Sequence, residues 1–87
     1  MVVHIPTPLR SYTDKQSVVE AGGRTLGEAL ARIDQDYPGF RFRIIDEQDG
    51  IREHIKIFIN EKPVRDLSAP TEPGDTIHII CALSGGV

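Results

Sequence analysis

Apolar and polar residues alternate along three stretches of the chain, Val2–Ile5, His54–Asn60 and Thr76–Ala82. Successive side chains of a β-strand point to opposite faces, so this alternation predicts strands with one buried face. The buried face is expected to carry Val3, Ile5, Ile55, Ile57, Ile59, Ile77, Ile79 and Cys81. The opposite face is expected to carry His54, Lys56, Phe58, His78, Ile80 and Ala82.

A helical pattern follows Thr25. Thr25 and Glu28 have the spacing of a capping box, in which threonine caps the first turn and the glutamate reaches back. An apolar stripe then recurs at helical spacing, made of Leu26, Ala29, Leu30, Ile33 and Tyr37. Pro38-Gly39 is expected to end the helix, and its charged opposite face is expected to meet solvent.

The remaining segments give weaker signals. Gln16–Ala21 is expected to form a second strand. Phe40–Ile45 alternates apolar and basic residues and favours a strand, although a short helix after the proline fits nearly as well. Turns are expected at Asn60–Pro63 and Pro73–Asp75, with a short strand at Val64-Arg65 between them.

The order of elements is therefore strand, strand, helix, strand, short strand, strand. One helix crossing a mixed sheet of four to five strands would bury every apolar stripe at once. This is the α+β, β-grasp (ubiquitin-like) arrangement. Another α+β sandwich or a ferredoxin-like fold is the alternative, but the latter needs a second full helix. We expect a domain at residues 1–83 and a flexible tail at residues 84–87 that carries Gly85-Gly86.

The size and the charge of the chain argue against several classes of function. A chain of 87 residues forms one small domain with little room for a deep catalytic pocket, which argues against an enzyme. The net charge is −3 and no basic run occurs, so neither nucleic acid nor a membrane is an expected partner. A single cysteine and the lack of a signal-peptide pattern favour the cytoplasm. We expect a monomer when the chain is free.

Catalytic and metal-binding patterns are weak. His4, His54 and His78 lie on separate predicted strands without the spacing of metal ligands, so no metal site is expected. Cys81 occupies an apolar strand position, where core packing is the better interpretation. Gly22-Gly23 lacks the lysine and spacing of a phosphate-binding loop and indicates a turn.

The C-terminal end of the chain is the candidate reactive site. Leu83-Ser84-Gly85-Gly86-Val87 follows directly on the last predicted strand. Glycines have no Cβ, so the tail can extend through a narrow channel of another protein. A carboxylate delivered in this way is a poor electrophile until adenylation makes AMP its leaving group. Attack by sulfur would then give a thiocarboxylate, which carries sulfur without releasing free sulfide.

Five segments keep a recognisable order and spacing: Ile5–Arg10, Gly23–Gly27, Ile57–Arg65, Gly74–Ile79 and Gly85-Gly86. Together they resemble the ThiS/MoaD ubiquitin-like sulfur carriers, and within that family the CysO-type carriers of thiocarboxylate-dependent cysteine biosynthesis. The resemblance covers nearly the whole chain. It implies that the Gly86 carboxyl is the attachment point of adenylate and thiocarboxylate, with Gly85 as its flexible neighbour and Ser84 in the same tail.

The resemblance also implies partners. An E1-like adenylyltransferase and sulfurtransferase would use ATP and magnesium, and this chain itself would bind no cofactor. A cysteine synthase-like acceptor would take the sulfur. Family members dock through an apolar patch on the open sheet face, which here would comprise Phe58, Pro63, Ile80 and Leu83.

One residue departs from the pattern. Active members end at the second glycine, whereas Val87 follows Gly86 here, so Val87 would have to be removed by a JAMM-type metallopeptidase. Val87 can also be foreign to the natural protein, or the chain can be a non-catalytic β-grasp interaction module. Molybdopterin or thiamin synthesis as the destination of the sulfur, and a ubiquitin-like protein modifier, remain alternative functions.

Overall fold

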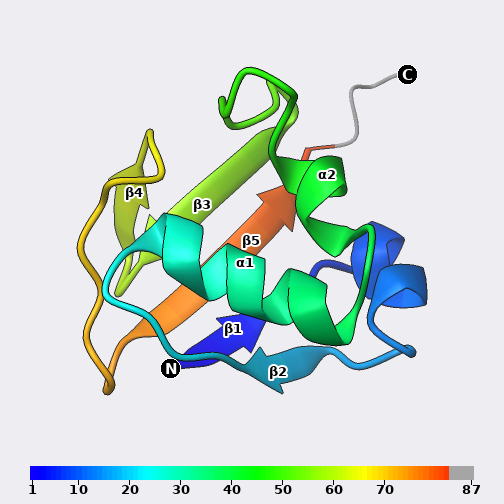
Figure 1. The fold of residues 1–87 in the computed structure, drawn as a ribbon, viewed down its shortest axis with the longest axis horizontal. Coiled ribbons are helices and arrows are strands. Elements are labelled where there is room, and N and C mark those ends of the chain that lie inside the picture. The colour runs from blue at the N-terminus through cyan, green and yellow to red at the C-terminus, as the bar shows by residue number, and fades with distance from the viewer. Residues whose placement is uncertain (83–87) are drawn as a thin grey trace.

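The computed structural model describes residues 1–82 and contains one five-stranded sheet with helices on a single side (Figure 1). The elements in chain order are β1 (Val2–His4), a 3-10 helix η1 (Thr7–Tyr12), β2 (Val18–Glu20), α1 (Leu26–Asp36), α2 (Phe40–Ile44), β3 (Ile55–Ile59), β4 (Lys62–Val64) and β5 (Thr76–Cys81). The predicted boundary between a domain at 1–83 and a tail at 84–87 lies outside the described residues.

The sheet has the order β2-β1-β5-β3-β4. β1 and β5 run parallel in its middle, while the pairs β1–β2, β3–β5 and β3–β4 are antiparallel. α1 crosses one face of this mixed sheet (Figure 1). The predicted β-grasp fold is thus confirmed. A ferredoxin-like fold is excluded, because α2, the second α-helix among residues 1–82, has only five residues.

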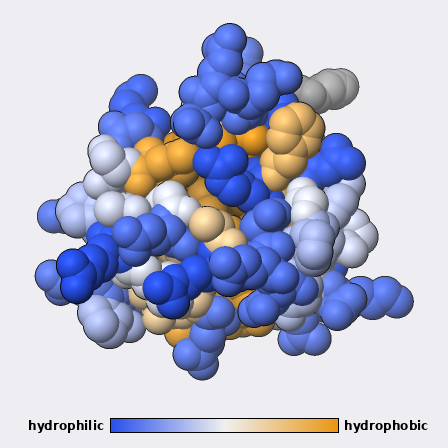
Figure 2. Space-filling view, viewed as in Figure 1, coloured by the Kyte–Doolittle hydropathy of each residue, from blue (hydrophilic) through white to orange (hydrophobic). Residues whose placement is uncertain are grey.

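The predicted apolar stripes form the core. The isoleucines of β3 and β5 that were expected to face inward are at most 8% exposed, and they pack with the apolar face of α1. Cys81 packs against the edge of this core and stays partly exposed. Figure 2 looks onto the helix side, where hydrophilic side chains cover most of α1, as expected for a face that meets solvent.

The start of α1 follows the predicted cap with one difference. The Thr25 hydroxyl accepts a hydrogen bond from the Glu28 N–H at 3.2 Å. The Glu28 carboxylate accepts from the N–H of Arg24 at 2.9 Å, one residue before the position expected in a capping box. At the other end, Asp34 Oδ1 accepts the N–H groups of Gly39 and Arg41, which ties α1 to α2.

The preferred strand interpretation of Phe40–Ile45 is wrong, and the short-helix alternative is correct for Phe40–Ile44. Gly39 takes a φ of 98°, which turns the chain after Pro38. Phe40 and Ile44 then lie one helical turn apart and are both fully buried, while Phe42 points outward and is 53% exposed. A strand would have placed all three on one face.

Two further expectations need correction. The segment after Pro6 forms the 3-10 helix η1, which the sequence pattern did not predict. β4 begins at Lys62, inside the predicted turn, because Asn60 and Glu61 alone make a two-residue turn with φ values of 50° and 74°. Pro63 is tolerated in β4 because this is an edge strand of the sheet.

Candidate functional site: the open sheet face and the root of the tail

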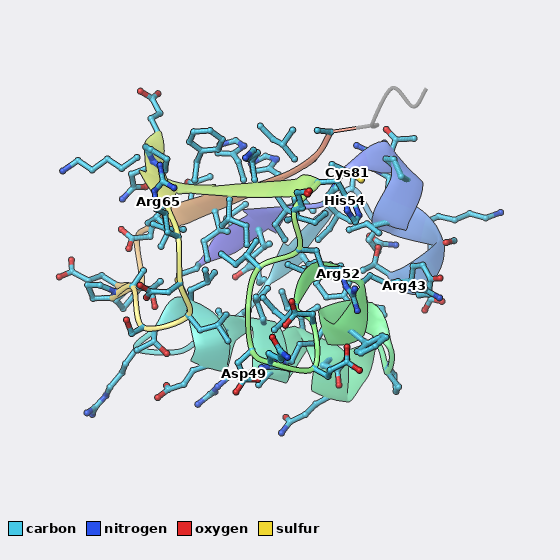
Figure 3. The ribbon with its side chains drawn as sticks, turned by 90° about the horizontal axis from the view of Figure 1, so that it is seen from above. Arg43, Asp49, Arg52, His54, Arg65 and Cys81 are labelled. Atoms are coloured by element: carbon cyan, nitrogen blue, oxygen red, sulfur yellow. The ribbon has the colours of Figure 1, made fainter. Side chains whose placement is uncertain are left out.

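The face of the sheet opposite α1 carries one residue from each strand in a continuous cross-strand row. The row is Val18, His4, His78, Phe58 and Pro63, each paired directly with the next. Directly paired residues project on the same side of a sheet, so these side chains form a strip across the whole open face. Figure 3 shows the sheet close to edge-on, with α1 and α2 on one side of it and neither of them on the other.

Three of the four predicted docking residues lie together on this face. Ile80 pairs with Lys56 and lies diagonally next to Phe58, which pairs with His78 and Pro63. Ile80 is 47% exposed, Phe58 is half-buried and Pro63 is exposed. The docking role of this surface stays a prediction. The fourth residue, Leu83, lies outside the described residues.

His4 and His78 form a stacked pair that the sequence did not reveal. Their ring centroids are 4.5 Å apart and the ring planes differ by 6°. The sequence assigned them to separate strands, and only the parallel pairing of β1 with β5 brings them together. The pair adjoins Phe58, so an aromatic platform of His4, His78 and Phe58 lies in the centre of the open face.

No third ligand accompanies these two imidazoles. Within residues 1–82, no group of three histidine, cysteine, aspartate or glutamate residues is arranged to hold a metal ion. That the whole chain binds neither a metal nor a cofactor stays a prediction.

The described structure ends at the root of the C-terminal tail. β5 lies between β1 and β3, and after it the Ala82 N–H donates a 2.7 Å hydrogen bond to the His54 carbonyl. The chain therefore leaves the sheet beside His54 and Cys81, where β5 is paired with β3 (Figure 3). The predicted reacting residue Gly86, its neighbours Ser84 and Gly85, and the additional Val87 lie outside the described residues.

No helix among residues 1–82 is both long and apolar enough to cross a lipid bilayer.

Comparison with known proteins supplies the context for this tail and face. The model of the ThiS family matches residues 3–86. The sulfur carrier protein CysO of Mycobacterium bovis is 33% identical over 91 residues, which cover 99% of this chain and 98% of that protein. The sulfur carrier protein CysO of Mycobacterium tuberculosis matches equally well.

Comparison with solved structures finds relatives of the same kind. A chain of the Amycolatopsis orientalis BexX/CysO complex superimposes with a TM-score of 0.91 at 32% identity and 98% coverage of both chains. Crystalline Mycobacterium tuberculosis CysO gives a TM-score of 0.87 at 30% identity, covering 94% of this chain and 98% of that one. The small archaeal modifier protein SAMP1 of Methanosarcina acetivorans gives 0.81 at 22% identity, over 98% of this chain and 94% of that one, which shows a shared fold alone.

Proposed function

Because this chain belongs to the ThiS family and is a sulfur carrier of the CysO type, we propose that it carries sulfur as a thiocarboxylate on Gly86. The observation that carries the proposal is the family match through residue 86, which includes the Gly85-Gly86 pair that begins four residues after the end of the central strand β5. The chain acts as a carrier and not as an enzyme. We expect it to act in the cytoplasm.

The proposed chemistry runs in two steps on a partner enzyme. A Gly86 carboxylate oxygen attacks the α-phosphorus of ATP, and pyrophosphate leaves. The acyl adenylate then accepts sulfur from a donor at the sulfide oxidation level, and AMP leaves with the electrons of the broken C–O bond. An E1-like adenylyltransferase would hold ATP and magnesium, so the carrier supplies only the carboxylate and the means to present it.

The acceptor step defines the pathway. The sulfur of the thiocarboxylate would attack an electrophile bound by a cysteine synthase-like enzyme and form a thioester. Hydrolysis of the carbonyl–sulfur bond would then leave the sulfur on the product and return the Gly86 carboxylate, which would assign the carrier to cysteine biosynthesis. The relative found in a complex with BexX is a CysO protein, so one carrier of this type has been crystallised together with a partner. On this chain, Phe58 and Pro63, together with the adjacent Ile80, form the surface that we assign to such docking, with Leu83 extending it.

The reaction requires that Val87 is first removed. With Val87 present, the Gly86 carbonyl belongs to a peptide bond and cannot attack ATP. We propose that a JAMM-type metallopeptidase removes this single residue.

ATP–pyrophosphate exchange tests the proposal. The carrier ending at Gly86 and the full-length chain would each be mixed with the E1-like enzyme of the same organism, ATP and labelled pyrophosphate. We expect exchange with the shorter chain alone. A chain that ends at Gly86 but lacks Gly85 is the control, and it should be inactive because the carboxylate no longer reaches the nucleotide. Equal exchange with the full-length chain, or none with either chain, would contradict the proposal.

A further inference from the structure

A groove with basic walls lies beside the root of the tail, away from the predicted docking strip. Its lining includes Tyr12, Phe42, Arg43, Arg52 and His54, contributed by η1, α2 and the segment before β3. Figure 3 shows His54 beside Cys81, with Arg43 and Arg52 at the same end of the molecule, on the side of the helices.

Both arginines of this groove are held in place by aromatic rings. The Arg43 guanidinium carbon lies 4.7 Å from the centroid of the Tyr12 ring, and that of Arg52 lies 4.5 Å from the centroid of the Phe42 ring. Stacking of this kind fixes the plane of a guanidinium while its N–H groups stay directed outward. Phe42 is 53% exposed, so one aromatic wall of the groove is open to a partner.

Arg52 is fixed further by its neighbours. Its Nε donates a 2.8 Å hydrogen bond to the Phe42 carbonyl, which leaves the two terminal nitrogens of the guanidinium for another acceptor. The hydrogen bond, the stacking and the neighbouring β3 keep this charge in one orientation. A pre-oriented donor loses less conformational entropy on binding than a free side chain does.

Neither groove arginine forms an ion pair within the described part of the chain. The ion pair found among residues 1–82 joins Arg41 to Asp49 at 3.2 Å and involves neither groove arginine. The Asp46 carboxylate interacts with Arg52 only weakly: the N–H groups of Gly50 and then Gln48 are the main reason that its pKa lies below the ordinary value, and Arg52 is the smallest contributor. The groove is therefore a local cationic surface on a chain of net charge −3.

The location of the groove identifies its occupant. The His54 carbonyl accepts the Ala82 N–H at 2.7 Å, so the groove adjoins the point at which the tail begins. An enzyme that takes residues 83–87 into its active site approaches the chain at Ala82, so a segment at the entrance of that site can reach this groove. Two oriented guanidinium groups suit carboxylates, which arginine can bind through two parallel hydrogen bonds.

We propose that this groove binds an acidic segment of the E1-like adenylating enzyme, located at the entrance that receives the tail. The inference rests on the proposed function. Arg43 and Arg52 would pair with carboxylates of that segment, His54 would donate a further hydrogen bond, and Phe42 would pack against its apolar stems. Such pairing at the edge of an interface mainly accelerates association and fixes orientation. The contact sets the angle at which the tail enters.

Charge reversal of Arg43 tests the inference, because its side chain is exposed and holds no other element together through a hydrogen bond among residues 1–82. The variant Arg43→Glu, in the chain ending at Gly86, would be assayed with the E1-like enzyme by stopped-flow association at low and at high salt. We expect association to slow about tenfold at low salt and the difference to shrink at high salt. Arg43→Gln should lie between the variant and the wild type.

Arg24→Glu is the matched control, since Arg24 is also exposed and lies just before α1, at the opposite end of that helix from the one that Asp34 ties to α2. It should associate within about twofold of the wild type. Equal slowing by both reversals would show a general charge effect and overturn the inference, and so would wild-type kinetics for Arg43→Glu. If the isolated carrier binds ATP and Arg43→Glu abolishes that binding, the groove is a phosphate site and the inference is overturned. If even the wild type gives no pyrophosphate exchange, the proposed function fails, whereas exchange without an Arg43 effect removes only this inference.

Discussion

Ile80 retains 47% exposure on a small domain whose other β-sheet isoleucines are buried. A single exposed isoleucine is ordinary on a protein surface. This one lies diagonally next to Phe58, which in turn adjoins the stacked His4 and His78 rings. Apolar and aromatic atoms are therefore continuous across the middle of the open face, which is the arrangement that a partner surface needs.

We predict that Ile80→Asp weakens docking to the E1-like enzyme by about 2 kcal/mol, or roughly thirtyfold, because a carboxylate would be desolvated at the centre of the contact. The apparent affinity in pyrophosphate exchange measures this effect. The free energy of unfolding should stay near the wild-type value, since the side chain is already half in solvent.

Val18→Asp provides the matched control for Ile80. Val18 is 41% exposed on the same open face, but it lies on the edge strand β2, two strands away from β5. It should dock like the wild type. If Ile80→Asp also docks normally, the open face is not the contact surface.

The sequence indicated the direction of these side chains but not their neighbours. Alternation alone placed Phe58 and Ile80 away from the helix, since a strand has a period of two. It contained no information on which strands pair, so the contact between His4 and His78 could not be predicted. The stacking of guanidinium groups on Tyr12 and Phe42 could not be predicted for a related reason. Tyr12 lies in η1, which the sequence did not predict, and Phe42 lies in α2, which was the less favoured interpretation of its segment.

At the level of elements, tertiary contacts decided the ambiguous segment. Phe40–Ile44 alternates like a strand, yet the hydrogen bonds from Gly39 and Arg41 to Asp34 and the burial of Phe40 and Ile44 select a helix. The five residues are too few for either period to be distinguished by pattern. The long signals of α1, β3 and β5 were predicted correctly because several apolar positions repeat in each.

The β3–β4 turn contains a measurable strain. Asn60 and Glu61 both have positive φ values. The conformational cost at Asn60 is offset by its side chain, whose Nδ2 donates a hydrogen bond to Asp75 and whose Oδ1 accepts the N–H of Thr76. Glu61 has no side-chain hydrogen bond of this kind within the described residues. A turn of two residues with positive φ favours glycine at its second position.

We therefore predict that Glu61→Gly raises the free energy of unfolding by about 1 kcal/mol, because glycine adopts this conformation without steric cost. Urea denaturation monitored by circular dichroism measures the change. Glu61→Ala removes the same charge but keeps the Cβ, and it should leave the stability nearly unchanged. Equal stabilisation by both variants would attribute the gain to charge and not to the backbone.

On the scale of the whole molecule, the fold is a rigid support for its C-terminus. The first half of β5 is paired with β1 on one side, β3 pairs with it through Cys81 on the other, and the last described residue is still hydrogen-bonded to the segment before β3. The open sheet face and the basic groove lie on different sides of this exit point. A partner that contacts both would hold the carrier by two surfaces and draw the tail into its active site.

The central claim is that Gly86 carries the sulfur, and intact-mass analysis of the protein purified from its native host tests it most directly. We predict a species that has lost Val87 and has exchanged one oxygen atom for sulfur, and alkylation with iodoacetamide should label that species once more than a chain with an ordinary carboxylate. If the protein is found only with Val87 retained and with no oxygen exchanged for sulfur, even during active cysteine synthesis, the account is contradicted.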